Sequence, residues 1–294
     1  MDVKNTLEVA VNSLKENTVD AEIAFFGGSF TAIDRQYMIS LLDAVKHYIK
    51  HFRGIRISTR PDCIDEQILA ILKSYNVTSI ELGAQSMCDD VLIANNRGHS
   101  ATDVINASKL IKDHGFSLGL QMMTGLYMSD VDKDIYTAQK IVELKPDTVR
   151  IYPTITMKNT QLEKLYNSGE YIPQTLLDAV SLCSRLLMLF DENNIRVIRL
   201  GLHHSDSLDT DMIAGPYHPA FKELCESEIL FNKLLAKLNN INTDKEIEVM
   251  VSPSCVSKMI GNKRSNINRL SELGYKIKVI QSDKIMNMDV VLKD

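Results

Sequence analysis

The sequence predicts an α/β fold built around a parallel sheet, and two observations carry this prediction. Six apolar, β-branched runs are spaced along the chain: AEIAFFGG, GIRISTR, SIELGAQ, FSLGLQMM, TVRIYPT and IRVIRLGL. Amphipathic helical patterns lie between them, such as QYMISLLDAVKHYIKHF and ATDVINASKLIKDHG. Near-continuous apolar strands that alternate with such helices are typical of a parallel sheet covered on both faces. A barrel and an open doubly wound sheet both fit this periodicity.

Composition limits the class of protein. The 294 residues, 45% hydrophobic and 24% charged, are typical of one large globular domain or of a large and a small one. A net charge of −5 argues against binding of the whole chain to nucleic acid or to an anionic membrane, so any basic patch must be local. No apolar run is as long as a membrane span, and the first twenty residues look like an amphipathic helix rather than a signal peptide. We therefore expect a cytoplasmic protein with no membrane partner.

The pattern changes after about residue 240. EIEVMVS is typical of a strand, PSCVSKMIG and RSNINRLSELG of two helices, and YKIKVIQS of a second strand. This β-α-α-β unit is predicted to be an appended module. We expect the large domain to span residues 1–235 and the small α/β module to span residues 244–294.

Polar residues follow the predicted strands at the point where each one ends. In parallel α/β folds ligands bind at the carboxyl ends of strands. Amide and hydroxyl groups beside an arginine suit a zwitterionic, ribose-bearing ligand, and no Gly-x-Gly-x-x-Gly or Walker loop is present to cradle phosphates. Each residue alone has a structural alternative, such as a surface salt bridge, a helix cap or a partner for buried backbone groups. The whole set favours a binding site. The residues are Gly27, Gly28, Ser29, Ser58, Thr59, Arg60, Gln85, Ser86, Gln121, Arg150 and Tyr152.

The cysteines and histidines do not predict a metal site. The five cysteines are scattered and include no C-x-x-C pair, so buried thiols are expected rather than a disulfide framework. His203, His204 and His218 lie near several aspartates, but adjacent histidines point in different directions and no H-x-x-x-H face exists. We interpret them as polar loop residues.

Several segments together resemble the radical S-adenosylmethionine (SAM) superfamily. They are EIAFFGGSFT, ISTRPD, ELGAQSM, NRGHS, GLQMMTGL, VRIYPT and AGPYHPAF, from about residue 20 to residue 225. They are similar to the branch related to the elongator catalytic subunit and, more distantly, to oxygen-independent coproporphyrinogen oxidase. The resemblance implies a partial parallel β/α (TIM-like) barrel that holds a [4Fe–4S] cluster and SAM.

The resemblance also implies which residues bind SAM. The Gly-Gly turn after the first strand corresponds to the family turn that contacts the methionine amino group. Gln85 matches the glutamine of the G-x-Q-S strand, and Arg97 matches the arginine of R-G-H. Ser58 and Gln121 stand where relatives have glutamate and aspartate, respectively. The implied cofactor-binding residues are Gly27, Gly28, Ser29, Ser58, Arg60, Gln85, Arg97 and Gln121.

The cluster-binding segment of this family does not match the chain. The family ligates its cluster through a C-x-x-x-C-x-x-C loop upstream of the Gly-Gly turn, because three thiolates must converge on one cluster. No cysteine precedes Cys63, and Cys63 and Cys88 are too far apart to supply that spacing. We expect the first strand and the cluster loop of the family to be missing here. The chain as written is therefore expected not to hold a normal [4Fe–4S] cluster.

The C-terminal module resembles a KH domain. KMIGNKRSNINRL is similar to the G-x-x-G turn that clamps a nucleic-acid backbone between two helices, with Arg264 in place of the second glycine. Residues 255–280 hold six basic side chains and one acidic side chain, Glu272. A solvated charged face is the alternative, and we favour RNA binding. The expected RNA contacts are Lys258, Gly261, Lys263, Arg264 and Asn266.

Two functions follow from these resemblances. The first is a radical SAM enzyme, in which a reduced cluster cleaves SAM to a 5′-deoxyadenosyl radical that abstracts hydrogen from tRNA or another RNA. It needs an electron donor as a partner and the iron–sulfur segment. The second is a non-catalytic RNA-binding or scaffold protein on a barrel without a cluster. The acetyltransferase half of the elongator subunit has no counterpart in these residues, and the sequence assigns no catalytic residue.

Overall fold

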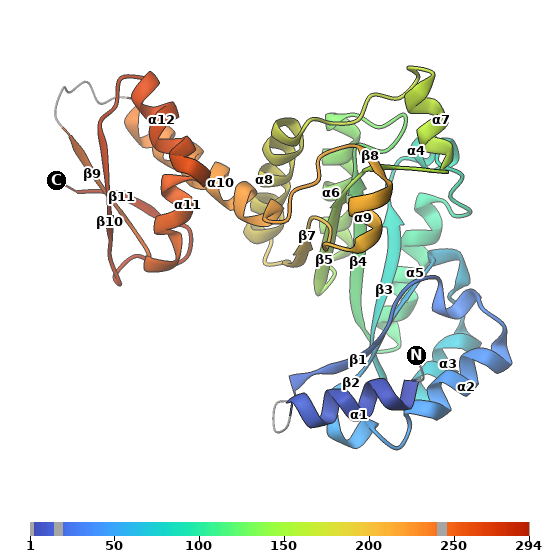
Figure 1. Ribbon diagram of the computed structural model, residues 1–294. Coiled ribbons are helices and arrows are strands. Elements are labelled where there is room, and N and C mark those ends of the chain that lie inside the picture. The colour runs from blue at the N-terminus through green and yellow to red at the C-terminus, as the bar shows by residue number, and fades with distance from the viewer. Residues whose placement is uncertain (1–2, 15–19, 240–245, 294) are drawn as a thin grey trace. The chain divides into compact units, whose positions relative to one another are not determined.

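The computed structural model describes residues 3–14, 20–239 and 246–293 (Figure 1). The chain divides into two compact units. Unit 1 contains residues 1–152 and 193–199, and unit 2 contains residues 153–192 and 200–294. The boundary expected near residue 240, with the module beginning at 244, falls in segment 240–245 and lies outside the described residues.

A six-stranded parallel sheet in the order β1-β2-β3-β4-β5-β7 forms the centre of unit 1. Phe25 pairs with Ile57, Ile57 with Ile80, and Ile80 with Leu118, all in parallel register. The sheet confirms the predicted α/β class and the partial barrel. Its strands are β1 (Glu22–Phe25), β2 (Gly54–Thr59), β3 (Val77–Gln85), β4 (Ser117–Thr124), β5 (Thr148–Pro153) and β7 (Arg196–Leu200).

Helices connect successive strands of unit 1, and polar side chains cap several of them. The Asp65 carboxylate accepts a hydrogen bond from the Ile68 backbone N–H at the start of α3, and Ser100 and Asp103 form a capping box at the start of α5. These N-terminal caps fix the residue at which each helix begins. The helices are α1 (Val3–Leu14), α2 (Arg35–Val45), α3 (Glu66–Ser74), α4 (Asp89–Ala94), α5 (Ala101–Asp113) and α6 (Val131–Leu144).

The two faces of the sheet differ in polarity. Ile57, Ile80 and Leu118 are completely buried on one face. Because side chains alternate along a strand, the residues next to these in each strand face the opposite side of the sheet. They include Arg56, beside Ile57, and Glu81, beside Ile80. We call that opposite side the polar face. Of the residues expected to bind a cofactor, Ser58 of β2 lies on this face.

Unit 2 contains the long helices α8 (Leu176–Glu192) and α10 (Phe221–Leu238), which pack against each other. Cys183 and Cys225 are both fully buried there. None of the helices in the described ranges is long and apolar enough to cross a membrane. The other elements before residue 240 are β6 (Thr156–Met157), α7 (Gln161–Asn167), α9 (Asp206–Asp211) and β8 (Met212–Ala214).

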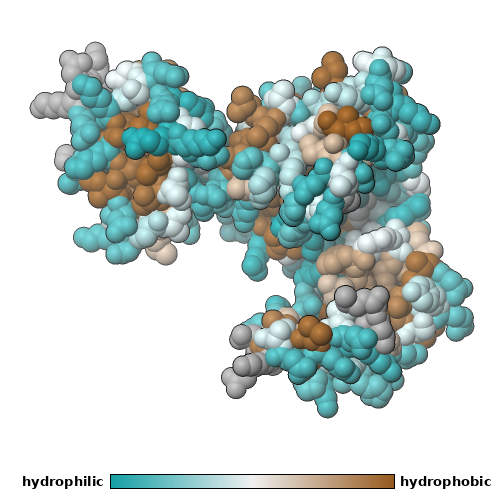
Figure 2. Space-filling view, viewed as in Figure 1, coloured by the Kyte–Doolittle hydropathy of each residue, from teal (hydrophilic) through white to brown (hydrophobic). Residues whose placement is uncertain are grey.

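The C-terminal module has the predicted β-α-α-β order and one further strand. Strand β9 (Ile247–Val251) pairs in parallel with β10 (Ile277–Gln281) and antiparallel with β11 (Val290–Leu292). Helices α11 (Val256–Ile260) and α12 (Ser265–Glu272) lie between β9 and β10 in the chain. Figure 2 shows a hydrophobic area over this sheet.

The last half of α10 belongs to the core of this module. Its buried side chains Leu230, Phe231, Leu234 and Leu238 join one hydrophobic cluster with residues from the module's own strands and helices. The module therefore uses a helix that precedes it in the sequence to complete its core.

Candidate functional site

A row of paired charges crosses the polar face of the sheet. Arg56 Nη2 lies 2.6 Å from Glu22 Oε2, and Arg56 Nη1 lies 3.0 Å from Glu81 Oε1. Arg150 Nε lies 2.7 Å from Glu81 Oε2. We call Glu22, Arg56, Glu81 and Arg150 the charge ladder. Each charge in it has a partner of opposite sign, so the ladder is electrically compensated.

A glycine lets the ladder cross strand β4. Glu81 is on β3 and Arg150 is on β5, with Gly119 of β4 between them. A Cβ atom at position 119 would come within 2.7 Å of the Glu81 Cγ atom. Because the glycine has no side chain, the Glu81 carboxylate can reach over β4 to Arg150. Gly119 is therefore required by close approach rather than by backbone conformation.

Electrostatics within the ladder favour ionised groups. Burial opposes ionisation of Glu22, but hydrogen bonds from Arg56, Ser79 and Thr78 leave the pKa of its carboxyl below the usual value. Burial likewise opposes the charge of Arg150, and its contacts with Tyr152 and Glu81 raise the pKa of the guanidinium overall. The Arg150 guanidinium also lies 4.7 Å from the ring centre of Phe26.

Two of the predicted cofactor residues are in direct contact at the ends of β3 and β4. Gln121 Nε2 donates a hydrogen bond to Gln85 Oε1 over 3.2 Å. Gln85 has φ of 64°, in the left-handed region that glutamine seldom adopts, and its side chain is buried. His99, which was not predicted, is also buried, and its Nε2 lies 3.0 Å from the Ala84 carbonyl oxygen. The strand end is therefore held in an unusual conformation by its neighbours.

Arg60 and Arg97 lie near each other but differ in their partners. Arg60 donates two hydrogen bonds to the Asp62 carboxylate, at 2.9 and 2.5 Å, which is the salt-bridge alternative considered above. Its guanidinium would collide with any side chain at Gly98, next to Arg97. Arg97 Nη2 donates to the Met123 sulfur, at 3.5 Å. Burial, and then the charge of Arg60, lower the pKa of Arg97. Within the described part of the chain, Arg97 forms no ion pair.

The remaining predicted cofactor residues are placed separately. Gly27 has φ of 106°, and a Cβ atom at Gly27 or Gly28 would meet no atom within 4 Å. Ser29 precedes a short helical turn, and Ser58 lies on the polar face of β2, paired in register with Glu81. Among the described residues, no hydrogen bond joins these four to Gln85 or Arg97. That all eight line one cavity stays a prediction.

The described residues do not fit an iron–sulfur cluster. No group of three or more His, Cys, Asp or Glu side chains among them is arranged to hold a metal ion. Burial raises the pKa of the Cys63 and Cys88 thiols, which disfavours the thiolate form that a cluster needs. His204 contacts Asp209 and the Tyr217 hydroxyl, at 3.5 and 3.3 Å. We derive no reaction step through a cluster.

The turn between α11 and α12 forms a second candidate site. We call residues 261–264 the GNKR turn. Gly261, Lys263 and Arg264 all have positive φ, and a Cβ atom at Gly261 would lie 2.8 Å from the Asn266 backbone nitrogen. Asn266 is buried, and its side-chain amide donates to the Ser227 carbonyl, the Ser227 hydroxyl and the Lys258 carbonyl, at 3.0–3.2 Å. The Asn266 side chain thus joins the turn to α10, and its expected RNA contact stays a prediction.

Acidic side chains distant in sequence neutralise part of the basic segment. Lys258 pairs with Glu226 at 2.7 Å and Arg269 with Glu228 at 2.6 Å, both acids being on α10. Lys278 pairs with Glu248 on β9. Neither Lys263 nor Arg264 forms an ion pair within the described ranges. The uncompensated positive charge is therefore concentrated on the GNKR turn.

The fold agrees with comparisons to known proteins. The chain matches the radical SAM superfamily over residues 2–138 and the radical SAM C-terminal domain over residues 146–230. It is 31% identical to Elongator complex protein 3 of Homo sapiens over 204 residues, which are 61% of this chain and 37% of that protein. It is 36% identical to the tRNA uridine(34) acetyltransferase of Methanocaldococcus jannaschii over 132 residues, 44% of this chain and 24% of that protein.

A solved structure shares much of the fold. Methanocaldococcus infernus Elp3 with an N-terminal deletion superimposes with a TM-score of 0.67 and 25% identity, covering 76% of this chain and 57% of that one. The parallel half-barrel and the matched segments are those of a radical SAM protein. The chain belongs to the radical SAM superfamily, on its elongator-like branch. The matched part of the chain spans little more than a third of the human relative's length.

Proposed function

We propose that this chain is a SAM-binding protein that acts on tRNA or another RNA. The observation that carries the proposal is Arg97, an exposed cation that forms no ion pair among the described residues and lies near the ends of β2 and β4, beside Arg60 and in contact with Met123. A guanidinium in this state suits the carboxylate of a zwitterionic ligand, because its charge has no counter-ion and its N–H groups can form charge-assisted hydrogen bonds to both carboxylate oxygens. The relatives named for tRNA modification support RNA as the substrate.

The residues at the strand ends fit the other parts of SAM. The Gln85–Gln121 amide pair retains donors and acceptors for ribose hydroxyls. The open backbone at Gly27 and Gly28 leaves room for the methionine end. When bound, SAM supplies a sulfonium whose cleavage in this family starts radical chemistry. In this chain the residues named here bind and orient that cofactor, and the GNKR turn binds RNA.

Calorimetric titration with SAM tests the first part of this proposal. Arg97→Ala should weaken SAM binding about tenfold or more, because hydrogen bonds to charged groups contribute about 1.5–3 kcal/mol. Arg35→Ala, a change of an exposed arginine on α2, should leave the affinity unchanged. Equal SAM affinity in the wild type and the Arg97→Ala variant would contradict the assignment of Arg97.

A non-catalytic RNA-binding or scaffold protein is the second candidate, and the poor fit of the thiols to a cluster favours it. Anaerobic reconstitution with iron and sulfide separates the two candidates. Fewer than about one iron per chain together with no SAM binding supports the scaffold. About four irons per chain with a broad visible absorption band contradicts it and also contradicts our expectation for this chain.

A further inference from the structure

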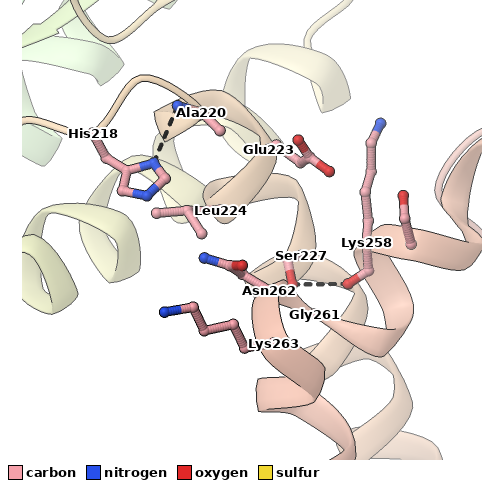
Figure 3. Close-up of a pocket in the computed structure, with 10 residues that line it drawn as sticks. His218, Ala220, Glu223, Leu224, Ser227, Lys258, Gly261, Asn262 and Lys263 are labelled. Carbon is pink, nitrogen blue, oxygen red and sulfur yellow. Dashed lines mark hydrogen bonds between the residues drawn. The ribbon is translucent and has the colours of Figure 1, made fainter.

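Two adjoining cavities lie beside the GNKR turn, within unit 2. The smaller has a volume of about 350 Å³ and the larger about 620 Å³. Both are lined by His218, Leu224, Ser227 and Asn262. Figure 3 shows the residues that line the smaller cavity. These volumes fall in the range of about 300–1,000 Å³ that small-molecule sites occupy. Unit 2 thus contains cavities of suitable size for a small molecule next to the expected RNA contacts.

One wall of the cavity carries a histidine, His218, whose neutral tautomer is set by a backbone hydrogen bond. The Ala220 backbone N–H donates to His218 Nδ1 over 3.1 Å. In the neutral ring the proton must therefore reside on Nε2, which is left as a donor. Figure 3 shows the His218 ring beside Leu224, with Nδ1 turned toward Ala220. The half-buried ring offers a flat face and a hydrogen-bond donor.

The opposite wall comes from the turn itself. Figure 3 shows the Asn262 amide nitrogen and the Lys263 ammonium reaching toward the side of the cavity on which His218 lies. Both side chains are exposed, and within the described residues neither has a hydrogen-bond partner. An amide is both donor and acceptor, so Asn262 matches the mixed edge of a nucleobase.

The lining favours a base over a bare phosphate. Leu176, Leu177 and Val180 of α8 add apolar surface to the larger cavity. Its acids are Asp178 and Glu228, and Glu228 is paired with Arg269, which lines the same cavity. A phosphate there would meet the Asp178 carboxylate and a guanidinium that already has a counter-ion. A phosphate outside it, on Lys263 and Arg264, would meet only the uncompensated cations of the turn.

We propose that this cavity takes one unpaired base of an RNA whose phosphate backbone lies on the GNKR turn. Single-stranded RNA is recognised by proteins that stack a splayed base and hydrogen-bond its edges, which is what His218, Leu224 and Asn262 offer here. The inference rests on the RNA-binding part of the proposed function and adds a subsite to it. The cavity binds the base, and the turn binds the phosphate backbone.

Fluorescence anisotropy with two labelled RNAs tests the subsite in the full chain. One is an unstructured 12-nucleotide RNA, and the other has the same backbone with abasic residues throughout. Asn262→Ala and, separately, His218→Ala should weaken binding of the intact RNA about tenfold, since base stacking and edge contacts are lost. Neither variant should change binding of the abasic RNA. Asn268→Ala, an exposed amide on α12 outside both cavities, is the matched control for Asn262.

The outcomes separate this inference from the proposed function. If both variants bind intact RNA as the wild type does, while Lys263→Glu with Arg264→Glu abolishes binding, the turn binds RNA and the cavity does not. Equal losses on intact and abasic RNA would also overturn the subsite, because the residues would then contact the backbone. If the wild type binds neither RNA at any salt concentration, the RNA-binding part of the proposed function fails as well.

Discussion

The charge ladder of unit 1 and the GNKR turn of unit 2 are both rich in arginine or lysine, but their charges differ in compensation. In the ladder, Arg56 and Arg150 share the buried Glu81 carboxylate. On the turn, Lys263 and Arg264 are exposed and form no ion pair with the described residues. Compensated, buried charges hold strands together, whereas exposed, uncompensated charges remain free for an anion. Whether an Arg or Lys side chain forms an ion pair therefore distinguishes structural from binding residues better than its residue type does.

Removal of the carboxylate shared in the ladder should have the largest effect on stability. Glu81→Gln leaves Arg56 and Arg150 without their common counter-ion on a face where they are largely buried. We expect the free energy of unfolding to fall by about 3 kcal/mol. Urea denaturation measures this, with Glu143→Gln in the exposed Lys140–Glu143 pair as the control, expected to change it by less than about 0.5 kcal/mol. A Glu81→Gln protein as stable as the wild type would show that the ladder is not structural.

The buried amide beside the turn should have the next largest effect. Asn266→Ala removes three hydrogen bonds and leaves the Lys258 and Ser227 carbonyls without this donor. We expect a loss of about 2 kcal/mol in the free energy of unfolding. Thermal and urea unfolding measure it, and Asn268→Ala should change it by less than about 0.5 kcal/mol. Unchanged stability combined with lost RNA binding would instead make Asn266 an RNA contact.

Asp134 offers a buried carboxylate whose hydrogen-bond donors are the Gly125 N–H and the Ser129 hydroxyl rather than guanidinium groups. Burial raises its pKa to about 6. Since this pKa is raised, the protonated form stabilises the fold at low pH, and that contribution is lost as pH rises through about 6. Between pH 5 and pH 8, wild type should lose about 1 kcal/mol relative to Asp134→Asn. Urea unfolding at both pH values measures the difference, and the exposed Asp132→Asn should show no such trend.

The turn itself should have the smallest effect on stability. Lys263→Glu with Arg264→Glu is expected to change the free energy of unfolding by less than about 0.5 kcal/mol, because both side chains are exposed. RNA affinity should nevertheless fall for all RNA sequences alike, because contacts to the backbone do not depend on sequence. The slope of log affinity against log salt concentration should decrease in magnitude by about one to two, since fewer counterions are released. Binding isotherms at several salt concentrations check this. Unchanged tRNA binding would make the turn a structural connection only.

The sequence predicted the parallel sheet well because the signal is local. Each strand appears as an apolar run between helical patterns, and the polar residue at its end is visible in the same window, as with Gln85 and Gln121. The ladder was missed although Arg56 and Glu81 interrupt apolar runs. The ion pairs of the ladder depend on the order of the strands and on a residue without a side chain, Gly119, on the strand between. Neither can be recognised within a single segment of the sequence.

The charge of the C-terminal module was overestimated for the same reason. Six basic residues and one acid within residues 255–280 indicated a basic surface, but Glu226, Glu228 and Glu248 lie outside that window and neutralise three of them. The short strand β11 was also missed, since three residues carry too little periodicity to be recognised. Local counts of charge are reliable only when the neighbouring elements are known.

The reach of Glu81 over Gly119 also has a consequence for how long the folded state lasts. Glu81 and Arg150 are 69 residues apart in the chain, and β4 must be in place between them before they meet. We expect a contact of such sequence separation to form after the transition state for folding, in which the nearer strand pairs are already closed. Interactions absent from the transition state slow unfolding without accelerating folding. The glycine in β4 thus lengthens the lifetime of the native sheet, and a side chain at that position would shorten it.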